Sequence, residues 1–152
     1  LGLILAQDPE VLVLDDFSLG LDPGYRRLFV DYMREYAKAE DKTVFLTSHI
    51  IQDMERLVDD CIVMDYGKIL VQMPVEELLG KFRRYTAQVS EGFRMQDTDG
   101  IYNPSVIRQT LELFSMLPEA EVRARLSLQG VADVQVEKVG LEDAFIGLTG
   151  KY

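Results

Sequence analysis

The chain has 152 residues, of which 47% are apolar and 28% charged, and its 26 acidic and 16 basic side chains give a formal charge of -10. This composition is typical of a soluble, acidic, globular protein rather than a disordered one. Charges interrupt every apolar run well before the ~18 residues that a membrane span requires. The acidic balance argues against a nucleic-acid partner, because such surfaces concentrate Lys and Arg. A single Cys and a single His exclude an internal disulfide and a four-ligand zinc site built from these residues.

The first half of the chain alternates between strand and helix. Apolar runs without alternation predict strands that are buried on both faces, and Asp followed by Pro predicts the cap and first turn of a helix. In chain order, the expected elements are a helix end at residues 1–7, a strand at 11–14, a helix from Asp22 to Ala39, a strand at 43–47 and a helix over 50–58. This order favours a parallel sheet in an α/β fold.

Residues 61–71 are expected to form two strands joined by a tight turn that contains Gly67. Such a pair commonly adds an antiparallel edge to a parallel sheet. A short helix is expected from Pro74 to Leu79, with Gly80 as its C-terminal cap. We place a domain boundary near residue 80.

Residues 81–152 are expected to form a small α+β unit. In chain order, they show a strand at 85–89, a polar loop at 91–103, an undecided segment at 104–116, a helix at 118–129, a strand at 131–139 and a helix at 141–148. The undecided segment fits a helix, because Ile107, Leu111 and Phe114 share one face, and also a strand, because Leu111 and Leu113 alternate with polar neighbours. Both interpretations stay open.

Two carboxylates, Asp15 and Asp16, follow the first apolar strand, at the end where ligands bind in open α/β sheets. Asp15 is a hard oxygen ligand suited to Mg²⁺, and Asp16 could orient or deprotonate an attacking water. The pair could equally just end a strand and begin a turn. Whether other functional side chains lie at the same edge of the predicted sheet distinguishes these two interpretations.

The only histidine, His49, follows the second apolar strand. If the two strands are adjacent and parallel, His49 lies at the same edge of the sheet as Asp15 and Asp16. An imidazole there could donate a hydrogen bond to a terminal phosphate. A single histidine beside a helix start is more often a surface or capping residue, so the prediction of a site depends on the convergence of the three side chains.

Two stretches of the chain carry a family resemblance. Residues 11–23, Val-Leu-Val-Leu-Asp-Asp-Phe-Ser-Leu-Gly-Leu-Asp-Pro, strongly resemble the Walker B motif and D-loop of ATP-binding cassette (ABC) ATPases, and residues 43–49, Thr-Val-Phe-Leu-Thr-Ser-His, resemble their H-loop. Residues 1–9 look like the helix that follows the signature motif, and residues 61–71 look like the strands after the H-loop. The resemblance implies that residues 1–80 are the C-terminal portion of a nucleotide-binding domain with a P-loop NTPase fold.

The resemblance implies a role for each matching residue. Asp15 would hold the Mg²⁺ of Mg-ATP, Asp16 would take the place of the catalytic glutamate, and His49 would contact the γ-phosphate. Residues 20–22 would form the D-loop, which places Asp22 in the nucleotide site where a second ATPase subunit closes over it. In this family the dimer of ATPase subunits lies on the cytoplasmic side of the membrane and drives a permease.

The chain departs from the family pattern at three points. Asp16 replaces a glutamate, which sets the carboxylate back by about one C–C bond, ~1.5 Å, and a misplacement of this size can slow hydrolysis ~10²-fold. Phe17 replaces a proline. The chain also contains no G-x-x-x-x-G-K-[ST] phosphate loop and no Leu-Ser-Gly-Gly signature. We therefore expect this chain alone not to bind ATP tightly. Because Leu1 is not Met, we also expect the chain to be a piece of a longer protein.

Residues 139–150 resemble the closing segment of bacterial exporter ATPase subunits, in which a small accessory domain follows the nucleotide-binding domain. Their apolar residues Leu141, Ala144, Phe145 and Leu148 are better explained as core than as a contact site. Dimerisation, regulation and docking all stay open as roles for this accessory domain. The transported substrate and the direction of transport are equally open.

The leading hypothesis is therefore an ATP-binding and ATP-hydrolysing subunit of an ABC transporter that powers transport through a membrane permease. The alternative is a non-catalytic, truncated cassette that acts as a protein-interaction or dimerisation module. In either case, strands 11–14 and 43–47 would expose apolar faces unless further chain covers them, so we expect the chain alone to self-associate.

Overall fold

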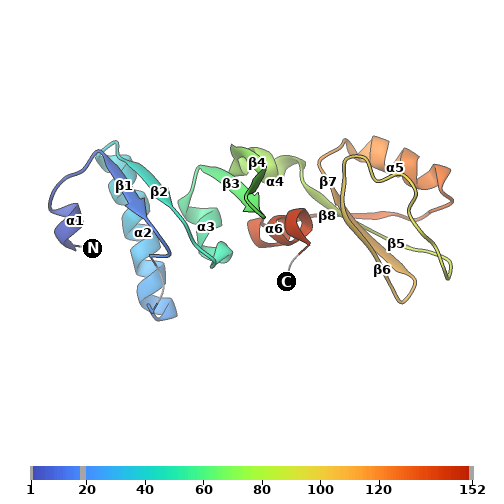
Figure 1. Cartoon of the computed structure of the whole chain (residues 1–152), viewed down its shortest axis with the longest axis horizontal. Helices are drawn as coiled ribbons and strands as arrows, with labels where there is room; N and C mark the ends of the chain where they lie inside the picture. The colour runs from blue at the N-terminus through green and yellow to red at the C-terminus, as the bar shows by residue number, and fades with distance from the viewer. Residues whose placement is uncertain (1, 18–19, 151–152) are drawn as a thin grey trace. The chain divides into compact units, whose positions relative to one another are not determined.

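The computed structural model describes residues 2–17 and 20–150. Ser18 and Leu19, which belong to the stretch that resembles a Walker B motif and D-loop, therefore lie outside the described part. The chain forms two compact units, Leu1–Val58 and Asp59–Tyr152, which are described separately (Figure 1). Both combine helices with small sheets, so the described fold is mixed α/β. In the described ranges, every helix is too short or too polar to cross a bilayer.

The first unit contains the predicted alternation of strands and helices. Its elements are α1 (Gly2–Leu5), β1 (Val11–Leu14), α2 (Pro23–Ala39), β2 (Thr43–Leu46) and α3 (Ile51–Leu57). Strands β1 and β2 pair in parallel, with Val11 opposite Thr43 and Leu14 opposite Leu46, and lie side by side in Figure 1. The predicted parallel pairing of the two apolar runs is confirmed.

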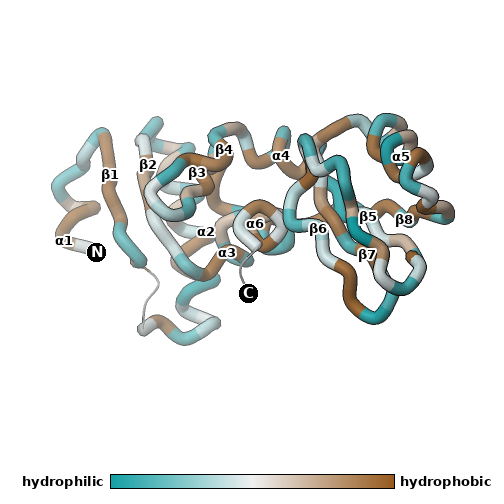
Figure 2. Tube along the Cα trace, turned by 45° about the vertical axis from the view of Figure 1, so that its right-hand side comes forward, coloured by the Kyte–Doolittle hydropathy of each residue, from teal (hydrophilic) through white to brown (hydrophobic). Residues whose placement is uncertain are grey.

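Only one face of the β1 and β2 pair is covered within this unit. Leu12 and Leu14 are buried against Met33 of α2. Val13 and Phe45 point to the other face and are 72% and 55% exposed. Burial on both faces is therefore not reached within this chain, because successive side chains of a strand alternate between faces and α2 packs on one of them. The exposed apolar face is the one expected for these strands when no further chain covers them. The tube in Figure 2 is accordingly hydrophobic along β1 and becomes hydrophilic where the strand ends.

Helix α2 begins as the Asp22 and Pro23 pair predicts. The Asp22 Oδ1 atom accepts hydrogen bonds from the backbone N–H groups of Gly24, at 2.9 Å, and Tyr25, at 3.1 Å. These two donors have no partner inside the helix, and Pro23 lacks an N–H that would need one. An ion pair of 2.5 Å between Arg26 and Asp53 then joins α2 to α3.

The second unit opens with a hairpin of β3 (Asp60–Asp65) and β4 (Lys68–Pro74). Tyr66 and Gly67, which connect the strands, both have positive φ angles, as a two-residue hairpin turn requires. The predicted hairpin is confirmed, but among the described strands it forms a sheet of its own and is not an edge of the β1 and β2 sheet. Turn residues specify which strands form the hairpin, whereas attachment to another sheet depends on pairing between distant segments.

Helix α4 (Val75–Lys81) continues through Gly80, so the prediction of a C-terminal cap at this glycine is wrong. The Arg83 guanidinium satisfies the last carbonyl groups instead. Its Nη1 donates to the carbonyl oxygens of Leu79 and Phe82, both at 2.8 Å, and its Nη2 donates to that of Gly80 at 2.5 Å. A long side chain beyond the helix has replaced the left-handed glycine that sequence patterns favour at this point.

A four-stranded antiparallel sheet forms the rest of the second unit. Its strands are β5 (Arg83–Gln88), β6 (Ile101–Ile107), β7 (Thr110–Ser115) and β8 (Gln135–Lys138), in the order β6-β7-β5-β8, and the helices beside it are α5 (Glu119–Leu128) and α6 (Leu141–Thr149). The undecided segment 104–116 is therefore strand. Arg108 and Gln109 form its turn with positive φ angles, which allow two strands where a helix was also possible.

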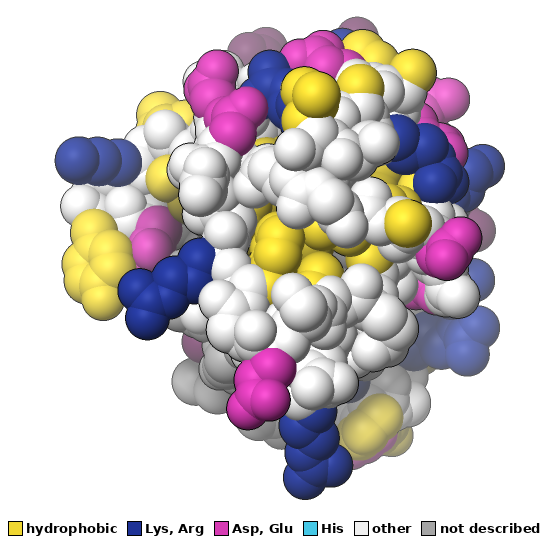
Figure 3. Space-filling model, turned by 90° about the vertical axis from the view of Figure 1, so that its right-hand side faces the viewer, with side chains coloured by type: hydrophobic (Ala, Val, Ile, Leu, Met, Phe, Trp, Pro, Cys, Tyr) yellow, Lys and Arg dark blue, Asp and Glu magenta, His cyan; other side chains and the backbone are white. Residues whose placement is uncertain are grey.

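The core of the second unit lies between this sheet and its helices. The fully buried residues include Tyr85, Leu111, Leu113, Val122 and Leu126. Partly buried hydrophobic residues border this core, and Figure 3 shows a recess on one side of the unit with hydrophobic side chains at its floor. The predicted boundary near residue 80 falls inside this unit. It concerns which part of the chain resembles the ATPase domain, and it stays a prediction.

Candidate functional site

The predicted site lies where β1 and β2 end. The parallel hydrogen bonding continues past the strands, because the Thr47 N–H donates to the Leu14 carbonyl at 2.9 Å and the Asp16 N–H donates to the Thr47 carbonyl at 3.1 Å. Asp15 and Asp16 therefore leave β1 beside the segment that leads to His49. The predicted convergence of these three residues at one edge of the sheet is confirmed as geometry.

His49 and Asp16 are in direct contact. The His49 Nδ1 atom lies 2.7 Å from Asp16 Oδ1, and the two side chains are 60% and 36% exposed. Asp16 has a φ angle of 43°, a left-handed conformation that Asp tolerates better than most residues because its short side chain can hydrogen-bond locally. With a carboxylate as its partner, Nδ1 is the nitrogen that carries a proton. The other nitrogen, Nε2, then accepts a hydrogen bond in neutral imidazole and donates one only in imidazolium.

The Asp15 carboxylate is held by Thr47. The Thr47 hydroxyl donates a hydrogen bond to Asp15 Oδ1 and accepts one from the Asp16 N–H at 3.1 Å. Sequence reasoning gave Thr47 no role of its own. The signal that identifies it is the register, since Leu14 pairs with Leu46 and the next residues along the two strands are Asp15 and Thr47.

Asp22 is placed differently from the other predicted site residues. Its Oδ1 atom caps α2 through Gly24 and Tyr25. Among the described residues, no hydrogen bond or ion pair joins Asp22 to Asp15 or Asp16. Its observed role is structural, and its assignment to a nucleotide site remains a prediction.

The site can share a divalent cation with a phosphate but does not form a complete protein cage. Over residues 2–17 and 20–150, no group of three His, Cys, Asp or Glu side chains is arranged to hold a metal. Mg²⁺ does not require such a group, because it commonly takes one or two carboxylates and completes its shell with waters and substrate phosphates. The exposed Asp15 carboxylate and its neighbour Asp16 fit this second arrangement.

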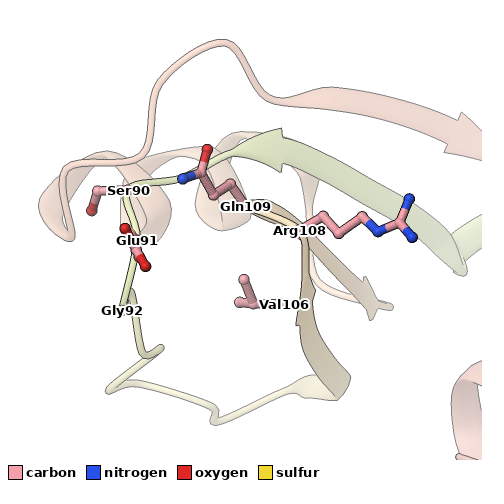
Figure 4. A pocket seen from close by; sticks show the side chains of 6 residues that line it. All are labelled: Ser90, Glu91, Gly92, Val106, Arg108 and Gln109. Carbon is pink, nitrogen blue, oxygen red and sulfur yellow. The ribbon is translucent and has the colours of Figure 1, made fainter.

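A separate hollow in the second unit does not share this chemistry. It lies by the β6 and β7 turn and is lined by Ser90, Glu91, Gly92, Val106, Arg108 and Gln109. In Figure 4 the Arg108 side chain extends away from that of Glu91, so the two charges do not converge on a common ligand. The hollow therefore offers no polar constellation comparable with the edge of β1 and β2.

Comparison with known proteins identifies the family. No protein-family model matches the chain. The Nod factor export ATP-binding protein I of Rhizobium sp. (strain N33) is 32% identical over 97% of the chain, and that of Rhizobium meliloti is 31% identical over 97%. The uncharacterized ABC transporter ATP-binding protein YhcH of Bacillus subtilis (strain 168) is 26% identical over 97%. The chain belongs to the ABC transporter ATP-binding proteins.

The similarity to ABC transporter ATP-binding proteins extends across both units of the chain. It covers 49%, 45% and 50% of the three relatives, so the chain spans about half of their length. The predicted membership of this family is thus confirmed over nearly the whole chain, whereas the Walker B and H-loop assignments of residues 11–23 and 43–49 stay predictions. The activity, substrate and partners of a whole protein of this kind are matters of proposal.

Proposed function

We propose that this chain provides the Walker B, D-loop and H-loop part of the ATP site in an ABC transporter ATPase subunit. Asp15 would hold Mg²⁺, Asp16 would orient the attacking water, and His49 would contact the γ-phosphate. The observation that carries the proposal is the contact of 2.7 Å between His49 and Asp16 at the carboxyl ends of two parallel strands. Family membership supports the same assignment.

The phosphate loop and signature motif of such a site are not in this sequence. Backbone N–H groups and a lysine of the phosphate loop cradle the β- and γ-phosphates in these enzymes. We therefore propose that residues 1–80 complete a nucleotide-binding domain whose other half lies earlier in a longer protein, and that residues 81–152 are its accessory domain. The intact subunit would pair with a second ATPase subunit and a permease at the cytoplasmic face of the membrane.

In this proposal, Asp16 and His49 act as a coupled pair. The Asp16 carboxylate can accept a proton from water or hold that water in line, and the His49 contact fixes the orientation of the carboxylate. The Nδ1 contact means that His49 can donate to a phosphate through Nε2 only as imidazolium, or after it leaves Asp16. Charge on His49 would then contribute to the stabilisation of phosphate in the closed site.

The test uses the complete gene product that contains this chain. Asp16→Asn should retain ATP binding and lower the turnover of ATP by about 10²-fold to 10⁴-fold, the usual contribution of a general base. ATP should remain trapped in a closed dimer. Asp31→Asn, on the exposed side of α2, is the matched control and should turn over normally. Unchanged turnover in Asp16→Asn would remove Asp16 from the mechanism.

A non-catalytic interaction module is the second candidate. The shorter carboxylate of Asp16 and the exposed apolar face of Val13 and Phe45 favour it for the chain as it stands. The discriminating measurement is the coding sequence upstream of Leu1. A phosphate loop roughly a hundred or more residues earlier supports the enzyme, and an initiator codon directly before Leu1 supports the module. Calorimetric titration of the chain with Mg-ATP gives a second test, since micromolar binding would show that the phosphate loop is dispensable.

A further inference from the structure

We propose that Thr47 is a positioning residue of the candidate site, whose hydroxyl orients the Asp15 carboxylate toward a divalent cation. This inference rests on the proposed function. It extends that function to a residue that contacts the Asp15 carboxylate and the Asp16 backbone N–H without being a metal ligand or a proton carrier itself.

The hydrogen bonds of Thr47 specify the direction of its hydroxyl. A hydroxyl has one proton to donate and can accept through its lone pairs. The Asp16 N–H approaches Thr47 Oγ1 at 3.1 Å and must be the donor of that bond. The Thr47 proton is thus free for Asp15 Oδ1, which has no proton to offer when ionised. One side chain therefore donates to the first acidic residue and accepts from the second.

The backbone of Thr47 is also hydrogen-bonded to the end of β1. Its N–H donates to the Leu14 carbonyl at 2.9 Å, and its own carbonyl accepts from the Asp16 N–H at 3.1 Å. The Asp16 N–H is thus shared between the carbonyl and the hydroxyl of Thr47. These bonds join the end of β2 to the end of β1 and place the hydroxyl within hydrogen-bond reach of both Asp residues.

An exposed carboxylate without such a partner can rotate among several orientations. The bond from Thr47 occupies Asp15 Oδ1 and leaves Oδ2 available to a cation. Groups that hydrogen-bond to a metal-binding carboxylate in this way orient it, and their loss commonly lowers metal affinity 10-fold to 100-fold, of which we expect about the lower limit here. The effect on folding should be small, because water can replace a hydrogen bond at an exposed site.

The experiment compares three variants of the complete gene product that contains this chain. Thr47→Val removes the hydroxyl and keeps the shape, Thr47→Ser keeps the hydroxyl, and Thr43→Val makes the same change at the exposed start of β2, away from Asp15. The readout is the affinity for Mn²⁺ in the presence of ADP, measured by electron paramagnetic resonance. We expect about tenfold weaker Mn²⁺ binding in Thr47→Val only, with the affinity of Thr47→Ser restored close to that of the parent protein.

A second comparison separates positioning from damage to the fold. In an Asp15→Ala background, Thr47→Val should cause no further loss of Mn²⁺ affinity, because the hydroxyl acts through the Asp15 carboxylate. An equal loss in both backgrounds would overturn the inference, as would normal Mn²⁺ affinity in Thr47→Val. If the parent protein binds no Mn²⁺ with ADP at all, the proposed function fails and this inference fails with it. If the parent protein binds normally and only the Thr47 result is negative, the proposed function stands alone.

Discussion

The His49 Nδ1 atom lies 2.7 Å from Asp16 Oδ1, across the ends of two strands whose sequences are 33 positions apart at these residues. A carboxylate in this position selects the tautomer of neutral His49 that carries its proton on Nδ1. Nitrogen-15 shifts of the imidazole in the 152-residue chain should show this tautomer directly. Asp16→Ala should abolish the preference, and Asp15→Ala should preserve it. A neutral ring with its proton mainly on Nε2 would contradict the observed contact.

Gly147 allows α6 to approach two aromatic rings. A Cβ atom at this position would lie 2.7 Å from Cγ of Phe114 and 2.9 Å from Cε1 of Phe82. Overpacking of this kind costs about 1–3 kcal/mol, which exceeds the gain of up to about 1 kcal/mol from replacing a helical glycine by alanine. Gly147→Ala should therefore lower the free energy of unfolding, as measured by urea denaturation.

The matched control for Gly147 is Gly80, which lies in α4. A Cβ atom built at Gly80 would meet no atom within 4 Å apart from its chain neighbours and the backbone of its own helix. Gly80→Ala should leave stability unchanged or raise it by up to about 1 kcal/mol, since alanine is the better helix former. Equal destabilisation by both substitutions would show that the contact of α6 with the aromatic rings does not set the requirement for glycine.

Two substitutions at Asp22 distinguish its role as the cap of α2 from its predicted role in a nucleotide site. Asp22→Ala removes the acceptor of the Gly24 and Tyr25 N–H groups and should cost about 0.5–2 kcal/mol of stability. Asp22→Asn retains a carbonyl acceptor and should remain close to the parent chain in thermal unfolding. If Asp22→Asn preserves stability but alters ATP turnover in the complete protein, Asp22 has a function beyond capping.

Burial raises the pKa of the Cys61 thiol above its ordinary value, and the neighbouring Asp60 carboxylate raises it further. At neutral pH the folded chain should therefore react more slowly with an alkylating reagent than the urea-unfolded chain. Cys61 is the only cysteine, so the measured rate reports on this thiol alone. The raised pKa also makes the free energy of unfolding depend on pH. The stabilisation from the protonated thiol is complete below the pKa of the unfolded thiol and is lost as pH rises through the pKa of the folded thiol. Equal alkylation rates of the folded and the unfolded chain would contradict the raised pKa of Cys61.

The exposed face of β1 should tolerate charge that its buried face cannot. Val13 is 72% exposed, whereas Leu12 is 1% exposed. Val13→Lys should leave unfolding of the first unit nearly unchanged and should reduce self-association in analytical ultracentrifugation, because it interrupts an apolar patch. Leu12→Lys should prevent stable folding of this unit. Strong destabilisation by Val13→Lys would show that its face is covered in solution.

Local features of the sequence determined much of the first unit and the first hairpin turn. Asp22 and Pro23 predicted the start of α2 because capping depends on residues within one helical turn. The turn at Tyr66 and Gly67 was predicted for the same reason. Even the meeting of Asp16 with His49 followed from two apolar runs and the rule that parallel strands end at the same edge.

Only the tertiary structure decided the features that depend on distant partners. Gly80 had the sequence signature of a cap, but Arg83 reached back to the last turn of α4 and the helix continued. Apolar strands predicted burial on both faces, yet Val13 is exposed because burial requires a covering element that the strand itself does not encode. Thr47 acquired its role in the same way, since one hydroxyl orients a carboxylate only after strand register brings it to Asp15. Caps and turns depend on residues that are close in the sequence, whereas these contacts depend on how segments far apart in the chain pair and pack.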